Sequence, residues 1–505
     1  MPKRPLFPKV CIAMGFSDVA SLLRCARDEV AAGEDFLEFR LDFLSEPGRG
    51  VEAIRSFVKE NPGCSILATC RRHQNHGRFN GSIEEQVRIL EAATEAGSRG
   101  VDIEIESAES APSQIEPLRA KVSLIISYHN FTGTPALEPV LRRMMRFRAD
   151  AYKLVTLARK PSDNHRLLSL ARSHGRAPLI LLAMGEVGFP TRVLSPACGG
   201  LYSYAAPRSA GGTASGQVSA RLMRQCYRVD RLSKSVRIYG VIADPVRHSI
   251  SPAVHNRAFH SRRIDAVYLP LLVAPSHLKD FFTLAEKLPL AGFSVTIPHK
   301  HKILRYLDGI DPLARRIGAV NTVWRKAGKW RGANTDVDGV LLPLKKKMNL
   351  SRSSVLVVGT GGAARGAAFS LADAGSRVSI VGRNPDRARA LAKVCGAEWV
   401  SRDHLAVSHF DALVHATPLG MYPHVDDCFF PDNIPAEVVF DMVYNPMETV
   451  LLRHARDQGK TVMPGIQMFL EQAARQFEIW TGETAPRPVM EKAALEALTP
   501  SAGDL

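Results

Sequence analysis

The sequence lacks several features that mark special classes of protein. No stretch of its 505 residues approaches the ~18–20 uninterrupted apolar residues of a membrane-spanning helix. The eight cysteines are scattered and form no CxxC pair, so the sequence predicts neither a zinc site nor a disulfide framework. We therefore expect reduced, mostly buried cysteines and no bound metal.

The sequence shows neither a targeting signal nor a nucleic-acid-binding motif. No apolar signal core and no long serine- and arginine-rich segment precede the first predicted strand, so the expected location is the cytoplasm. The net charge of +16 is not gathered in one block. Anionic small ligands account for the basic excess, so we expect small-molecule substrates and neither nucleic acid nor membrane partners. The oligomeric state is left open.

The first half of the chain alternates apolar, strand-like runs with helical stretches. The eight runs are Val10–Met14, Phe36–Leu41, Ser65–Cys70, Val101–Ile105, Val122–Tyr128, Ala151–Val155, Leu179–Ala183 and Leu201–Tyr204. Eight such units in about 220 residues predict a (β/α)8 barrel. An open doubly wound sheet is the alternative, but it would need a reversal of strand order that the sequence does not indicate.

Polar residues occur on one face, or at the carboxyl end, of five successive strands, where a barrel enzyme places its site. They are Glu38, Arg40 and Asp42 on the second strand, Thr69 and Arg71 on the third, Asp102, Glu104 and Glu106 on the fourth, Ser127 and His129 on the fifth, and Lys153 on the sixth. Burying such charges without partners is costly, so the ring is either self-neutralising or a site for a polar anion.

Lys153 is the clearest chemical candidate. Burial inside a barrel disfavours the charged form of a lysine and frees its amine to form a Schiff base with a ketone. His129, one strand away, is placed for general acid/base work, and Glu104 is placed to orient its imidazole. A cation suited to a substrate carboxylate and two capping residues of the last loop complete the predicted site: Arg192, Thr213 and Gln217.

Five segments of the first half carry a family resemblance: Glu38–Asp42, Val101–Glu104, Ser127–Phe131, Tyr152–Val155 and Ser215–Gln217. In this order they resemble type I 3-dehydroquinate dehydratase, which implies Schiff-base dehydration of 3-dehydroquinate to 3-dehydroshikimate. The resemblance implies Lys153 as the imine-forming lysine, His129 as the general acid/base and Glu104 as its partner. It implies a substrate site made by Glu38, Arg40, Arg71, Arg192, Thr213 and Gln217.

The second half is organised around the buried strand Val355–Val358 and the small-residue turn that follows it. Gly359 permits the tight turn, Gly361 lets the backbone approach a pyrophosphate, and Ala364 lets the next helix pack on the sheet. The pattern predicts a dinucleotide site. A glycine-rich turn that binds no ligand is the alternative.

The tip of the next strand indicates which dinucleotide binds. An NAD site normally places an acidic residue there, but Val378–Val381 is followed by Arg383 and Arg387 instead. Two arginines suit a 2′-phosphate, so the sequence favours NADP(H). Solvated surface arginines are the alternative.

Lys300 and Asp336 form a candidate proton-transfer pair, provided that the fold brings them together. A hydride that moves from a nicotinamide to a ketone needs a proton donor at the oxygen, and this pair is able to supply it. Ser249 and Ser251 lie just before a predicted helix. Their hydroxyls either cap that helix or bind a polyol or carboxylate.

From Val236 onwards these motifs resemble shikimate dehydrogenase. The resemblance implies that Lys300 and Asp336 are the catalytic pair. It implies a shikimate site formed by Ser249, Ser251, Thr296, Asn321, Asp336, Tyr444 and Gln472. It implies cofactor contacts at Gly359, Thr360, Gly361, Gly362, Ala363, Arg383, Arg387, Thr417, Met442, Gly465 and Met468. One departure is His415, which stands where asparagine is common in that family.

The sequence thus predicts an α/β protein with a (β/α)8 barrel followed by a two-lobed dehydrogenase module with a Rossmann-like NADP domain. The predicted domains are a barrel over 1–231, a shikimate-binding domain over 236–345 plus 463–505, and an NADP domain over 346–462. The predicted function is dehydration of 3-dehydroquinate followed by NADPH-dependent reduction to shikimate. The alternatives are a quinate/shikimate dehydrogenase that prefers NAD, fused to the dehydratase, and a catalytically silent metabolite sensor.

Overall fold

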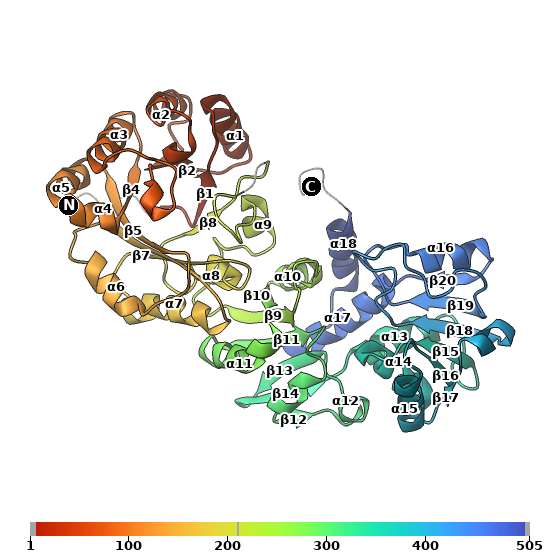
Figure 1. Cartoon of the computed structure of the whole chain (residues 1–505). Helices are drawn as coiled ribbons and strands as arrows, with labels where there is room; N and C mark the ends of the chain where they lie inside the picture. Colours follow the sequence, from red (N-terminus) through yellow and green to blue (C-terminus); the bar gives the residue numbers. More distant parts are fainter. Residues whose placement is uncertain (1–6, 210–211, 500–505) are drawn as a thin grey trace. The chain divides into compact units, whose positions relative to one another are not determined.

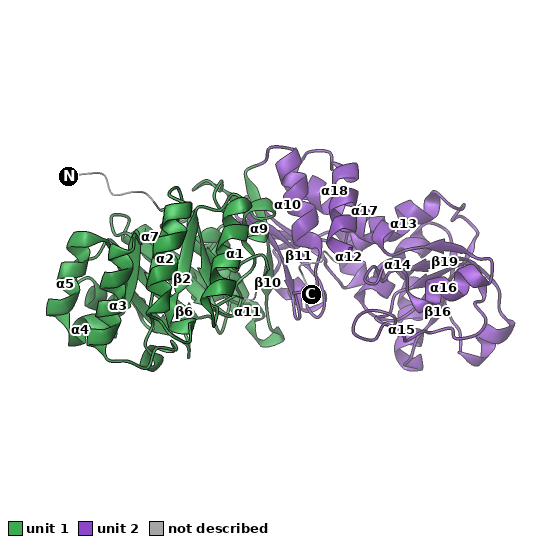
Figure 2. Cartoon of the chain, turned by 90° about the horizontal axis from the view of Figure 1, so that it is seen from above, with its two compact units in different colours: residues 1–237, 265–289 green, residues 238–264, 290–505 purple. Residues whose placement is uncertain are grey.

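The computed structural model describes residues 7–209 and 212–499, which form two compact units (Figures 1 and 2). The first unit contains the residues up to 237 together with 265–289. The second contains 238–264 and the residues from 290 onwards. Within the described residues, no helix is both long enough and apolar enough to cross a membrane.

The first unit holds the eight predicted strands in one parallel sheet. They are β1 (Val10–Met14), β2 (Phe36–Arg40), β3 (Ser65–Thr69), β4 (Gly100–Glu104), β5 (Ser123–Asn130), β6 (Ala151–Leu157), β7 (Leu179–Met184) and β8 (Ser203–Ala205). Their order is β7-β6-β5-β4-β3-β2-β1-β8. Between the two ends of this order, Leu201 N donates a hydrogen bond to Leu179 O (2.8 Å), so the sheet is nearly closed. The prediction of a barrel is confirmed.

Helices follow the strands and cover the outside of the sheet, as Figure 1 shows in red to yellow. They are α1 (Val19–Ala31), α2 (Arg49–Glu60), α3 (Ile83–Glu95), α4 (Ile105–Ser110), α5 (Pro112–Lys121), α6 (Leu137–Met144), α7 (Ser162–Ser173), α8 (Phe189–Leu194) and α9 (Ala220–Gln225). The amphipathic α2 turns Val51, Ile54 and Phe57 inwards and leaves its charged residues exposed. Burial of such apolar faces, more than helix propensity, is what holds these helices in place.

Two details of the predicted polar ring are wrong. Glu106 does not continue the inner face of β4, because the chain enters α4 directly after Glu104. Its carboxylate instead accepts a hydrogen bond from Asn75 Nδ2 (2.9 Å). Asp42 lies just beyond β2, in the short 3-10 helix Leu41–Phe43, rather than on the strand itself.

Residues 265–289 belong to the same compact unit as the barrel, although the predicted division assigns them to the second domain. They contain β10 (Ala266–Leu272) and α11 (Leu278–Lys287). Asp280 of α11 accepts hydrogen bonds from the backbone N (2.8 Å) and the Oγ (2.7 Å) of Ser162, at the start of α7. A carboxylate at a helix N-terminus satisfies an otherwise unpaired N–H group and complements the helix dipole. The three-domain division stays a prediction.

The second unit contains two sheets. The first is a six-stranded sheet, of which this unit holds the strands in the order β9-β11-β13-β14-β12. Their bounds are β9 (Arg237–Ala243), β11 (Leu290–Val295), β12 (Gly309–Ile310), β13 (Thr322–Lys326) and β14 (Lys329–Ala333). Its helices are α10 (Ser251–Ser261), α12 (Pro312–Ile317), α13 (Asp336–Lys345), α17 (Ile466–Thr481) and α18 (Arg487–Leu498). Because α17 comes late in the chain and packs on α13, the chain returns to this part after the second sheet.

The second sheet is parallel, with the order β17-β16-β15-β18-β19-β20. Its strands are β15 (Ser354–Val358), β16 (Arg377–Val381), β17 (Glu398–Trp399), β18 (Phe410–His415), β19 (Ala436–Asp441) and β20 (Thr461–Met463), with helices α14 (Gly362–Asp373), α15 (Pro385–Cys395) and α16 (Val450–Asp457). Numbered along the chain, this is the 3-2-1-4-5-6 order of a Rossmann sheet. The order reverses between β15 and β18, and ligands bind such sheets at that point.

Candidate active sites

Lys153 lies inside the barrel, on β6, with its amine held by three side chains. Its Nζ donates to Asp102 Oδ2 (2.9 Å) and Tyr204 Oη (3.0 Å), and it lies 3.6 Å from Glu38 Oε1. The lysine side chain is 5% exposed and that of Asp102 is fully buried. Burial acts to raise the pKa of Asp102, but Lys153 and Arg71 outweigh it and hold that pKa below its usual range.

His129 shares a face of β5 with Ser127, which pairs in register with Lys153 on β6. The imidazole is therefore two residues nearer the carboxyl end of the barrel than the lysine. Burial, with a smaller contribution from Arg71, holds the pKa of His129 well below its ordinary value. The ring is consequently neutral and able to accept a proton, as a general base must be.

Glu104 is held by groups other than the imidazole. Its carboxylate accepts hydrogen bonds from Gln86 Nε2 (2.7 Å) and Arg72 N (3.1 Å), and it lies 3.6 Å from Arg71 Nε. Burial raises the pKa of Glu104. Among the described residues, His129 Nδ1 is buried without a hydrogen-bond partner. The predicted orienting role of Glu104 therefore stays a prediction.

The barrel contains cationic donors that the described residues leave unsatisfied. The Nε and Nη2 atoms of Arg71 and the Nε atom of Arg192 are buried and make no hydrogen bond with the described residues. Burial lowers the pKa of Arg192 to about 10, still high enough to keep its charge at neutral pH. Arg71 is ion-paired at 3.6 Å with Asp102 and Glu104. Because buried donors without hydrogen bonds are costly in a native protein, this cluster is suited to an anionic substrate.

The other predicted substrate-binding residues of the barrel have different surroundings. Arg40 forms a buried two-bond pair with Asp42 (2.9 and 2.8 Å), which occupies much of its donor capacity. Arg192 NH2 donates to Ser215 O (2.9 Å), which ties the arginine to the last loop. In that loop, Gln217 Oε1 accepts a hydrogen bond from Ala214 N (3.2 Å), and Thr213 lies against Gly15 after β1.

Sequence reasoning did not assign site roles to Asp102, Tyr204 and Gln86, three residues that hold the barrel's reactive groups. Asp102 was expected on the correct face of its strand, and only the fold shows that it contacts Lys153. Tyr204 lies on β8 with its ring 4.2 Å from the Lys153 nitrogen. Gln86 is fully buried on the helix α3, where a polar residue at an inward position was the available signal.

In the second unit, the fold brings Lys300 and Asp336 together. Lys300 Nζ donates to Asp336 Oδ2 (2.6 Å), while Asn321 Nδ2 donates to Asp336 Oδ1 (2.7 Å). Asp336 begins α13, and its own N–H donates to Asn334 Oδ1 (3.1 Å). The carboxylate is buried, whereas the lysine side chain is 16% exposed, so the amine is the part of the pair that solvent and a ligand reach.

Other predicted polyol-binding residues of this unit are placed as follows. Ser249 Oγ accepts a hydrogen bond from the N–H of Ser251, the first residue of α10, so it meets one helix N–H rather than acting as the N-cap. Thr296 follows β11 and is partly exposed. Gln472 of α17 donates to Phe469 O (3.0 Å), and the ring of Tyr444 lies 4.9 Å from that of Phe469.

The glycine turn after β15 has the expected geometry. Gly359 has φ +125°, and a Cβ atom there would lie 2.8 Å from Ala416 O, so both conformation and space require glycine. A Cβ at Gly361 would meet no atom within 4 Å, which leaves room for a ligand beside the turn. A Cβ at Gly362, the first residue of α14, would lie 3.5 Å from Lys300 Cδ. The turn therefore lies beside the catalytic candidate, with Thr360 and Ala363 as its other members.

The other predicted cofactor contacts surround the carboxyl ends of this sheet. Arg383 and Arg387 follow β16 and are exposed. Thr417 and Met442 follow β18 and β19. At the start of α17, Gly465 lies so close to Val443 O that a Cβ would approach it to 2.3 Å, and Met468 packs against Gly339. The residues present fit a dinucleotide with a 2′-phosphate.

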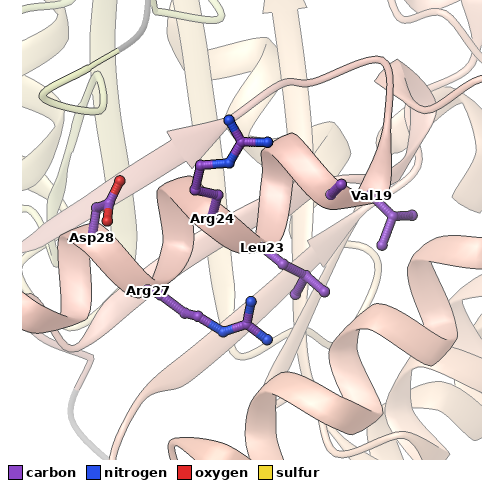
Figure 3. A pocket seen from close by; sticks show the side chains of 6 residues that line it. Val19, Leu23, Arg24, Arg27 and Asp28 are labelled. Carbon is purple, nitrogen blue, oxygen red and sulfur yellow. The ribbon is translucent and has the colours of Figure 1, made fainter.

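A separate pocket lies on the outer surface of α1 (Figure 3). None of its lining residues is a predicted site residue, and Arg27 among them is already paired with Glu60 (3.0 Å). The lining residues are Val19, Ala20, Leu23, Arg24, Arg27 and Asp28. Within the described residues, no group of three or more His, Cys, Asp or Glu side chains is arranged to hold a metal ion.

Family models match most of the chain. The type I 3-dehydroquinase model matches residues 10–234. The substrate-binding domain of shikimate dehydrogenase matches 241–323, the shikimate/quinate 5-dehydrogenase model 342–419, and the C-terminal domain of shikimate 5′-dehydrogenase 465–495.

Curated relatives match the whole arrangement or its second half. The chain is 33% identical over 480 residues to the chloroplastic bifunctional 3-dehydroquinate dehydratase/shikimate dehydrogenase of Arabidopsis thaliana, covering 90% of this chain and 79% of that protein. It is 40% identical over 280 residues to the NADP(+) shikimate dehydrogenase of Methanobrevibacter smithii, covering 53% of this chain and 99% of that protein. Among solved structures, shikimate 5-dehydrogenase of Thermus thermophilus in complex with NADP(H) and shikimate is 35% identical, with a TM-score of 0.49, covering 52% of this chain and all of that one.

The arrangement of both halves, and the relative that spans 90% of the chain, identify a lyase and an oxidoreductase on one polypeptide. The chain belongs to the family of bifunctional 3-dehydroquinate dehydratase/shikimate dehydrogenases.

Proposed function

We propose that Lys153 is the nucleophile of the dehydratase and that His129 is its general acid/base. The observation that carries the proposal is the buried amine of Lys153, held by Asp102 and Tyr204 close to unsatisfied cationic donors. Such a site binds an anionic ketone and brings its carbonyl to a nitrogen fixed in position. The substrates that we propose for the chain are 3-dehydroquinate, 3-dehydroshikimate and shikimate.

The dehydration follows from these positions. The amine of Lys153 attacks the ketone carbon, and the carbonyl oxygen leaves as water when the imine forms. The imine draws electrons from the adjacent carbon–hydrogen bond, and neutral His129 accepts that proton. The resulting imidazolium returns the proton to the departing hydroxyl, which leaves as a second water. Hydrolysis of the imine then restores the amine and releases the enone.

For the dehydrogenase, we propose that Lys300 and Asp336 handle the proton that accompanies hydride transfer. Bound NADPH supplies the hydride. Lys300, the more exposed member of the pair, donates a proton to the carbonyl oxygen, and Asp336 holds the amine in position through its 2.6 Å hydrogen bond. Asn321 fixes the other carboxylate oxygen, so that the pair is oriented before substrate arrives.

The proposed cofactor is NADP(H). Two exposed arginines, Arg383 and Arg387, follow β16, where the adenosine ribose of a Rossmann ligand lies. The name of the Methanobrevibacter smithii relative specifies NADP(+). The cytoplasmic location inferred from the sequence stays a prediction, and the Arabidopsis relative is chloroplastic by its name.

Replacing Lys153 by Ala should abolish dehydration and spare reduction. We expect the dehydration rate to fall by about a thousandfold or more, because the nucleophile is lost. Enone absorbance reports dehydration, and NADPH loss with added 3-dehydroshikimate reports reduction in the same preparation. Dehydration that persists near the parent rate would refute the imine mechanism.

Replacing Lys300 by Ala should impair reduction and spare dehydration. Loss of the proton donor is expected to lower kcat for reduction by about 10²- to 10⁴-fold, with dehydration unchanged. The exposed neighbour Lys302 provides the matched control as Lys302→Ala. If both variants reduce 3-dehydroshikimate as fast as the parent chain, Lys300 is not the proton donor.

Replacing Arg383 by Ala should raise KM for NADPH by about ten- to a hundredfold, because a charged contact to phosphate is lost. KM for NADH should change little, since NADH has no 2′-phosphate. Arg389→Ala is the control, because Arg389 is an exposed arginine of α15 that pairs with Asp386. Equal effects of Arg383→Ala on both cofactors would remove the argument for a 2′-phosphate contact.

A further inference from the structure

A continuous chain of hydrogen bonds joins the carboxyl ends of β18 and β19. His415 Nδ1 lies 2.9 Å from Asp441 Oδ1, and His415 Nε2 lies 2.6 Å from Thr417 Oγ1. Thr449 Oγ1 donates to Asp441 Oδ2 (2.6 Å), and Val443 N donates to Asp441 Oδ1 (3.1 Å). His415 and Asp441 are at most 1% exposed. The site residues named above do not include His415 or Asp441.

The Asp441 carboxylate fixes the direction of the first hydrogen bond in this chain. A carboxylate only accepts hydrogen bonds, so the hydrogen between Asp441 and His415 lies on Nδ1. The other ring nitrogen, Nε2, meets the Thr417 hydroxyl at 2.6 Å. The Thr417 oxygen in turn accepts from Leu419 N (3.3 Å). The rotation of the Thr417 side chain is thus set by a buried imidazole whose own orientation is set by Asp441.

His415 also occupies the point where the strand order of the sheet reverses. It pairs with Val358 of β15 and with Asp441 of β19. A Cβ at Gly359, the residue after Val358, would lie 3.2 Å from Thr417 Cγ2, so Thr417 lies against the glycine turn. Met442 N donates to His415 O (2.9 Å), which fixes the start of the loop after β19. One residue therefore links both loops that flank the glycine turn.

We propose that His415 is a positioning residue of the cofactor site, acting through Thr417. The imidazole transmits the fixed geometry of Asp441 to the Thr417 hydroxyl and keeps that side chain against the Gly359 turn. The inference rests on the proposed contact between Thr417 and NADP(H). What the inference adds is how Thr417 is held in place. The imidazole of His415 is long enough to reach from the buried carboxylate of Asp441 to Thr417 in the loop after β18.

A double-substitution cycle tests this inference with NADPH binding as the readout. The variants are His415→Leu, Thr417→Val and the double variant, and the fluorescence of bound NADPH gives the Kd at equilibrium without any turnover. Each single variant should raise the Kd about three- to tenfold, the size of one lost hydrogen bond. The double variant should bind no more weakly than Thr417→Val, because both changes remove the same contact.

Two further variants protect the test. His409→Asn changes an exposed histidine just before the same strand and should leave the Kd unchanged. Should His415→Leu fail to fold, His415→Phe enters the cycle in its place. Its ring fills the space of the imidazole but has no nitrogen to meet Thr417, so the same loss and the same non-additivity are expected.

Each other outcome overturns the inference in a recognisable way. An unchanged Kd in the His415 variant, with Thr417→Val weakened, shows that the imidazole does not position Thr417. Losses that add in the double variant show that His415 acts on the cofactor by another route. An unchanged Kd in Thr417→Val removes the proposed Thr417 contact itself, and the inference falls with it. If the inference is correct, KM for NADPH rises in the His415 variant, while kcat at saturating NADPH stays within about twofold of the parent value.

Discussion

Both proposed active sites depend on a lysine held against a buried carboxylate. Lys153 meets Asp102 at 2.9 Å inside the barrel, and Lys300 meets Asp336 at 2.6 Å in the second unit. An unpaired charge at either place would cost several kcal/mol, so each carboxylate is what allows its lysine to lie there. The surroundings then separate the two chemistries. Lys153 is 5% exposed and close to a neutral histidine, which suits covalent attack, whereas Lys300 is open enough to pass a proton.

The secondary structure that carries these lysines was predictable because its patterns are local. Eight apolar runs at regular spacing predict the barrel, and strand, glycine turn and helix predict the nucleotide-binding part. The inward positions of Lys153 and Glu38 follow from alternation along a strand. Contacts between distant segments show the limit of this reasoning. Asp280 accepts a hydrogen bond from Ser162, and two residues 118 positions apart leave no local signal.

Contacts between side chains of different strands were the part that sequence could not supply. Tyr204 reads as an ordinary apolar residue of the last strand, yet its hydroxyl reaches the Lys153 nitrogen. In the sequence, His415 is only a departure from a family pattern. Its contact with Asp441 becomes apparent only from the pairing of β18 with β19. In both cases the partner is fixed by the register between strands, which depends on the whole sheet. The strands that carry the predicted site residues were therefore foreseen, the supporting residues were not, and the site roles themselves stay predictions.

The most direct test of the two-enzyme account is one reaction that contains only the purified chain, 3-dehydroquinate and NADPH, followed by the loss of NADPH absorbance. The account predicts steady oxidation, with one NADPH consumed for each 3-dehydroquinate, and no other enzyme added. Absence of oxidation under these conditions, in a preparation that reduces added 3-dehydroshikimate, would contradict the proposed role of the Lys153 barrel.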